Sequence, residues 1–235
     1  MLRKALSLVL PDRLLDQIAF EVRVKLKSAR ARRARLERFQ RMEAIRIQVG
    51  CGPRPVEGWV NLDLLDDPRI DYWDARDGLP FRDGAVEAIY TEHFLEHLEY
   101  SDEAPAFLRE CHRCLGEGGI LRVVVPDAEA YMRLYAQDDW DGLARLRPLT
   151  VEDGGYRDCW LPKSYATRME LINALFRQDG EHRYAYDFET LERLLHKAGF
   201  TVVRRAAFGV SSDPQMPGDT PQRASESLYA EATKT

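Results

Sequence analysis

From residue 44 onward, short apolar runs alternate with turn residues and with helical patterns. Five of the runs are typical of strands: IRIQV (45–49), GWVNL (58–62), RIDYW (69–73), VEAIYT (86–91) and ILRVVV (120–125). A helical pattern at 101–119 separates the last two, with Ser101 as its expected N-cap and glycines at its end. Strands that alternate with helices predict an α/β fold, in which helices cover both faces of a mostly parallel sheet.

Residues 127–187 interrupt this alternation with two or three helical patterns, which we interpret as an insertion over the sheet. After the insertion, FETLERLLHKAGF (188–200) predicts a helix that Gly199 ends, and TVVRRAAF (201–208) predicts a strand. SLYAEAT (227–233) is expected to form a last strand, so the predicted sheet has seven strands.

Residues 1–44 differ from the rest of the chain in charge. They hold twelve Lys or Arg and five Asp or Glu, a charge of +7, which leaves −12 on the remainder. Apolar residues recur every three or four positions over 12–42, which predicts an amphipathic helix with Asp12 as its N-cap. We weigh two interpretations: a helix docked on its own domain, or peripheral contact of residues 12–42 with an anionic membrane. The acidic body argues against nucleic acid as a partner.

Nothing in the sequence predicts export. The apolar run from Ala5 to Leu10 is too short for a signal peptide, and no stretch reaches the ~18–20 apolar residues of a membrane-spanning helix. The four cysteines lack the regular spacing of a disulfide framework. We therefore expect a cytoplasmic protein, on the inner membrane face if residues 12–42 bind lipid.

Polar or glycine residues follow each of the first five predicted strands. In chain order they are Gly50-Cys51-Gly52, Asp63, Asp74, Thr91-Glu92-His93 and Pro126-Asp127. In an open α/β sheet, ligands bind beyond the carboxyl ends of the strands. Glycines let the backbone approach a ligand closely, and two carboxylates on adjacent strands suit a ribose diol and an amine. The sequence therefore predicts a ligand site at this edge of the sheet.

His93, Glu96 and His97 spell H-x-x-E-H, the order of the inverted zinc-peptidase motif. A zinc site needs a third ligand and an ordered second shell. The motif also follows a predicted buried strand at the ligand edge, where it has a role without metal. We keep the zinc hydrolase as an alternative and expect no metal.

Several segments together resemble one known family. RIQVGCG, NLDL, LPFRDGAVEAIYTEHFLEHL and LGEGGILRVVVPD look like successive motifs of class I S-adenosylmethionine-dependent methyltransferases, and YDFETLERLLHKAGF agrees with them. The similarity is greatest to a small bacterial branch with GCG…GWVNLD. It implies a Rossmann-like sheet with an antiparallel last strand. Residues 1–44 are then an N-terminal extension, and 45–235 are the methyltransferase domain, with 127–187 as a lid that binds the acceptor.

The resemblance also implies roles for single residues in binding S-adenosyl-L-methionine. Gly50, Cys51 and Gly52 would border its methionine and ribose portions, and Asp63 would bind the ribose hydroxyls. Asp74 would bind the adenine amine and Leu64 would contact the ring. Glu92 and His93 would line the sulfonium end.

Two departures concern this site. Gln48 stands where the family usually has an acidic residue, so we expect it to bind the cofactor's amino group without a full charge, and Arg54 replaces the usual third glycine. Only eight residues join the first two strands. Extended, they span about 27 Å, enough to retrace a strand of about 17 Å. A loop without a helix N-terminus weighs against a dinucleotide, because that N-terminus is what binds a pyrophosphate.

Methyl transfer to a hydroxyl uses a general base, whereas an amine needs only to be neutral. The base candidates are His97, His182, His93 and Asp127, although Asp127 is equally an N-cap for the following helix. Aromatic residues of the insertion are expected to form the acceptor pocket, namely Trp140, Tyr156, Trp160 and Tyr165. The predicted function is methylation of a small polar molecule, such as a sugar, a glycan precursor or a secondary metabolite. The alternatives are the zinc hydrolase and a non-catalytic scaffold with the cofactor fold.

Overall fold

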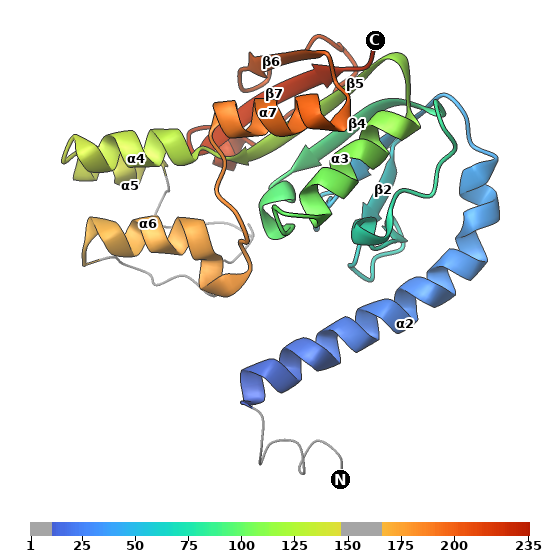
Figure 1. Ribbon diagram of the computed structural model, residues 1–235, viewed down its shortest axis with the longest axis horizontal. Coiled ribbons are helices and arrows are strands. Elements are labelled where there is room, and N and C mark those ends of the chain that lie inside the picture. Colours follow the sequence, from blue (N-terminus) through green and yellow to red (C-terminus); the bar gives the residue numbers. More distant parts are fainter. Residues whose placement is uncertain (1–10, 147–165) are drawn as a thin grey trace.

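The computed structural model describes residues 11–146 and 166–235, which form a seven-stranded sheet in the order β3-β2-β1-β4-β5-β7-β6 (Figure 1). The strands are β1 Ile45–Val49, β2 Val60–Asp63, β3 Asp71–Tyr72, β4 Val86–Glu92, β5 Leu115–Pro126, β6 Val202–Ala206 and β7 Ser227–Thr233. β1 to β5 pair in parallel, and β7 runs antiparallel to both β5 and β6. The predicted Rossmann-like sheet with an antiparallel last strand is confirmed.

Helices α3 (Glu103–Cys114) and α7 (Phe188–Ala198) contact each other over one face of the sheet (Figure 1). Both are amphipathic, and their apolar sides belong to the main core together with the central strands. The expected cap of α3 was wrong by one residue, since Asp102 and not Ser101 accepts the hydrogen bond from the Glu103 amide. Gly199 ends α7 as predicted, with a φ of 113° that a side chain would disfavour.

The chain leaves the sheet after β5 and forms α4 (Ala128–Ala136), α5 (Trp140–Leu146) and α6 (Arg168–Arg177), which confirms the predicted helical insertion (Figure 1). The three helices share a small core of their own, made of Tyr131, Leu143, Leu171, Ile172 and Leu175. A capping box at Thr167 begins α6. Trp140 begins α5, whereas Tyr156, Trp160 and Tyr165 lie outside the described residues.

Helix α2 (Asp12–Gln40) follows Pro11, so Asp12 lies in the first turn and is not the N-cap that we expected. The C-terminal part of α2 docks on the body, because Phe39 is fully buried with its ring edge-on to Trp73 and Phe81. Five apolar side chains of the helix are nevertheless exposed: Leu14, Ile18, Phe20, Val22 and Leu26. None of the helices within 11–146 and 166–235 has the length and apolar character to cross a membrane.

Candidate active site

The register of the sheet places the predicted ligand residues along one edge. Val49, the last residue of β1, pairs with Leu62 on one side and Thr91 on the other, and Asp63 pairs with Tyr72. Gly50, Asp63 and the residues after β3 and β4 therefore follow one another along the carboxyl ends of four neighbouring strands. Backbone hydrogen bonds extend the alignment past the strands, from the Gly50 amide to the Leu62 carbonyl (2.9 Å) and from the Trp73 amide to the Asp63 carbonyl (3.0 Å).

The loop after β1 makes close approach to a ligand possible. Gly50 has a φ of 68°, and a Cβ there would lie 2.5 Å from the Phe94 ring. Gly52 has a φ of 55°, and a Cβ there would meet no atom within 4 Å, so its Cα faces open space. Cys51 is buried between them, which raises the pKa of its thiol to about 12 and keeps it neutral.

Asp63 links this loop to β2. One carboxylate oxygen accepts a hydrogen bond from the Gly52 amide (2.8 Å) and the other accepts one from the Leu65 amide (3.0 Å). Each oxygen of a carboxylate accepts two such bonds, so Asp63 has capacity left for a diol. Leu64 follows, half-buried. The open glycine loop beside a carboxylate fits the ribose portion of the predicted cofactor.

The short connection between β1 and β2 forms turns without a regular helix, as its length predicted. Two buried side chains satisfy its backbone. The Val56 amide donates to Gln48 Oε1 (3.0 Å) and to Asn61 Oδ1 (2.8 Å), and Asn61 Nδ2 donates to the Val56 and Trp59 carbonyls. This contact gives Gln48 a structural role in the loop. Arg54 is exposed.

Asp74 lies at the expected edge but binds within the chain. Its buried carboxylate accepts from the Arg76 amide and side chain (2.9–3.1 Å) and contacts Lys25 Nζ at 3.4 Å. Burial opposes the charge, but the hydrogen bonds and charge of Arg76 hold the pKa of Asp74 below its ordinary value. These four contacts fill the acceptor positions of a carboxylate, so the adenine role predicted for Asp74 finds no unused oxygen. Arg76 also pairs with Glu21 of α2.

β4 ends at Glu92, whose carboxylate accepts hydrogen bonds from the amide (3.0 Å) and hydroxyl of Thr220. His93 follows in the left-handed region, with a φ of 51°, a conformation that is uncommon outside glycine and concentrates at functional sites. Its amide donates to the Val124 carbonyl (2.8 Å), and its Nε2 lies 2.8 Å from Ser227 Oγ. β4, β5 and β7 thus fix the direction of His93.

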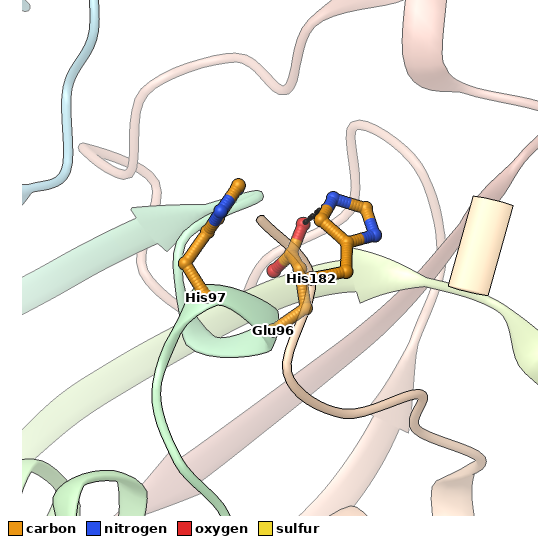
Figure 2. A group of neighbouring side chains, drawn as sticks. All are labelled: Glu96, His97 and His182. Carbon is orange, nitrogen blue, oxygen red and sulfur yellow. Dashed lines mark ion pairs between the residues drawn. The ribbon is translucent and has the colours of Figure 1, made fainter. Parts of the chain in front are cut away.

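The H-x-x-E-H residues do not share one α-helix. Leu95–His97 is a 3₁₀ turn, and the segment that leads into α7 brings a further histidine to it. Figure 2 shows Glu96 and His97 on this turn and His182 on the neighbouring segment. One Glu96 oxygen, Oε1, lies 3.4 Å from His93 Nδ1 and 4.0 Å from His182 Nε2. The rings of His97 and His182 meet edge to face, 4.9 Å between centroids.

We call Glu96, His93, His97 and His182 the histidine cluster. The Glu96 side chain is 1% exposed, and neither of its carboxylate oxygens accepts a hydrogen bond from another described residue. Burial raises the pKa of Glu96 to about 8. Burial also lowers the pKa of His97, so His97 is neutral near pH 7 and able to accept a proton.

Asp127, the remaining base candidate, caps a helix. Its carboxylate accepts from the Ala130 amide (3.0 Å) at the start of α4 and pairs with Arg205 Nη2 (3.1 Å). These contacts explain its position after β5 without a catalytic role.

Residues 28–205 match the family described as the methyltransferase domain. The chain belongs to this family. Family membership confirms the predicted enzyme class, a methyltransferase with S-adenosylmethionine as its cofactor, and decides against the zinc hydrolase. When bound, the cofactor supplies a methyl carbon that its positive sulfur activates.

A search of curated proteins found no match. Among solved structures, the chain is similar to an S-adenosylmethionine-dependent methyltransferase of Thermotoga maritima, with 16% identity over 95% of this chain and 97% of that one, and a TM-score of 0.48. A methyltransferase of Archaeoglobus fulgidus gives 16% identity over 90% and 94%, with a TM-score of 0.47.

Proposed function

We propose that this methyltransferase methylates a hydroxyl group of a small polar molecule, such as a sugar, a glycan precursor or a secondary metabolite. The observation that carries the proposal is the histidine cluster after β4. A hydroxyl must lose its proton when its oxygen takes the methyl group, so a nearby base accelerates the reaction. A neutral amine has no such need, and three imidazoles around a buried carboxylate favour the hydroxyl.

Each residue then has a task that follows from its position. Gly50, Gly52 and Asp63 hold the ribose and methionine portions, and Glu92 borders the sulfonium end. His97 is half-buried and neutral, and with His182 it accepts the proton of the acceptor hydroxyl. We expect the predicted lid, residues 127–187, to exclude water from the site, so that binding holds the two reactants in line.

Aromatic and polar groups beside the cluster suit a sugar-like acceptor. Tyr100 and Tyr184 stack with 4.0 Å between ring centroids, and both lie near Tyr186. The Tyr186 hydroxyl is buried and has no hydrogen-bond partner among the described residues. A hydroxyl-rich ligand offers both the apolar ring face and the hydrogen bonds that such groups need.

The test is turnover of a panel of hydroxyl and amine acceptors, followed by release of S-adenosylhomocysteine. His182→Gln and His97→Gln are expected to lower kcat about 10²–10⁴-fold without weakening the binding of S-adenosylhomocysteine. His196→Gln is the matched control, because this histidine lies on α7 with its Nδ1 2.8 Å from the Phe200 carbonyl. Turnover with amines alone, or unchanged kcat in both cluster variants, would contradict the proposal. No turnover with any acceptor would support the scaffold alternative.

The exposed apolar side chains of α2 support one further part of the proposal, peripheral contact with an anionic membrane from the cytoplasmic side. Co-sedimentation with anionic vesicles tests it. Phe20→Ser is expected to weaken sedimentation, and equal sedimentation with neutral and anionic vesicles would speak against it.

A further inference from the structure

Glu96 is the buried polar group whose environment is least explained by methyl transfer. A carboxylate removed from water normally accepts several hydrogen bonds, because an unsatisfied buried group costs free energy. Neither oxygen of Glu96 accepts one from another described residue. Instead, one ring nitrogen each of His97 and His182 and one Glu96 oxygen all lie within 4.8 Å of one another. Nitrogen and carboxylate ligands that converge in this way are what a divalent transition-metal ion needs.

The His182 imidazole is held as in a metal ligand. His182 Nδ1 lies 2.6 Å from the Leu175 carbonyl, which can only accept, so Nδ1 carries a hydrogen. In the neutral ring the lone pair is then on Nε2, the atom that faces Glu96 at 4.0 Å. Metal-binding histidines typically donate their second ring nitrogen to a carbonyl in this manner.

The two segments that carry these side chains are tied together. The Arg183 and Tyr184 amides both donate to the Glu96 carbonyl, at 2.7 and 3.3 Å. His182, adjacent to Arg183, is therefore fixed beside Glu96 by backbone hydrogen bonds. Ligand atoms around a tetrahedral zinc lie about 3.3 Å apart. Side-chain rotation that brings the ligand atoms closer by about 1–1.5 Å would therefore let the cluster bind an ion.

We propose that Glu96, His97 and His182 bind a divalent transition-metal ion, for which Zn²⁺ is the probe. Two histidines and one glutamate leave a fourth position open, as in catalytic zinc sites and unlike structural ones. The inference rests on the proposed function and deepens it. With an ion bound, the ring nitrogens of His97 and His182 would be ligands and could not take the proton, so His93, outside the ligand set, would replace them as the base. The ion would hold the acceptor oxygen at the open position and stabilise its deprotonated form.

Binding is measured on the full chain, made metal-free with a chelator, by calorimetry with Zn²⁺ and with Mg²⁺. One Zn²⁺ per chain is expected, with Mg²⁺ binding far more weakly because it prefers oxygen ligands. Three variants, His182→Ala, His97→Ala and Glu96→Gln, are each expected to weaken Zn²⁺ binding at least about 100-fold. His196→Ala is the matched control and should bind as the unaltered chain does. No cofactor or acceptor is present, so the result is independent of methyl transfer.

X-ray absorption at the zinc edge keeps the test decisive if a variant does not fold. Only nitrogen and oxygen neighbours at about 2.0–2.2 Å are expected, whereas sulfur at about 2.3 Å would assign the ion to cysteine and overturn the proposal. Failure of the unaltered chain to bind Zn²⁺, or equal binding by all three variants, would also overturn it. Full methylation of a hydroxyl by metal-free protein would refute the role of the metal in the reaction and leave the proposed function intact. Zn²⁺ bound by these residues without hydroxyl methylation would support the metal and refute that function.

Discussion

Arg122 on β5 allows a direct test of how much stability the sheet loses when a buried charge is left only partly paired. Its side chain is 1% exposed, and all five N–H groups donate. Two go to Asp219, one goes to Glu231 on β7, and two go to the carbonyls of Ala207 and Val210. Asp219→Ala removes two of the five acceptors and one of the two carboxylates, and it leaves a buried guanidinium only partly compensated.

Breaking a buried ion pair by removing one partner costs about 3–5 kcal/mol. We expect Asp219→Ala to lower the free energy of unfolding by that amount. Asp67→Ala is the control, because Asp67 pairs with Arg69 at the surface, where solvent screens such pairs and they contribute little to stability. The effect also reaches the active site, since the next residue, Thr220, holds Glu92.

The assay is urea unfolding followed by tryptophan fluorescence, with the slope of the transition compared between variants. The double variant Arg122→Met/Asp219→Leu separates charge from packing. It removes the buried guanidinium as well, and Glu231 keeps its pair with Arg204, so it should be more stable than Asp219→Ala alone. A loss below about 1 kcal/mol in Asp219→Ala, equal to the surface control, would refute the reasoning.

Three further predictions concern the cofactor loop and the acid stability of the sheet. Asp63→Ala is expected to weaken S-adenosylhomocysteine at least about tenfold by calorimetry, because charged hydrogen bonds contribute about 1.5–3 kcal/mol, and unchanged affinity would remove the ribose assignment. Gly50→Ala should destabilise the chain by at least about 2 kcal/mol in urea, since its Cβ would overlap the Phe94 ring. Burial alone would raise the pKa of Glu231, but hydrogen bonds led by Arg204 hold it at about 2, below the ordinary 4.5. This stabilisation, about 3 kcal/mol, is complete above pH 4.5 and is lost as the pH falls towards 2; Glu231→Gln should flatten that dependence of unfolding.

The strands could be predicted because each apolar run is short and is bounded by turn residues. β1 and β7 begin and end at the predicted residues, whereas β5 begins at Leu115, five residues early. The glycines at 116, 118 and 119 indicated the end of a helix. In the sheet, however, Leu115 pairs with Val86 across an irregularity in β4, so the strand includes them. Sequence patterns do not show such long-range pairing.

The site could be predicted where chain order alone determines it. Parallel strands end at one edge, so Gly50, Asp63 and Glu92 were expected there and lie there. The contacts of Asp74 were not predictable, because its competing partners include Lys25 from a helix almost fifty residues earlier. The approach of His182 to Glu96 likewise depends on backbone hydrogen bonds between distant segments.

Arg122 and Glu96 differ in a way that bears on function. Both are buried ionisable residues on or just after neighbouring strands. Every N–H of Arg122 is satisfied, whereas neither oxygen of Glu96 accepts a hydrogen bond from another residue in the described part of the chain. His93, two residues before the turn that carries Glu96, has a left-handed conformation. Unsatisfied and strained groups reduce stability, so they persist where they serve chemistry and not where they only support the fold. Because this sheet fully satisfies a buried charge at Arg122, the condition of Glu96 is best explained by a ligand that completes it.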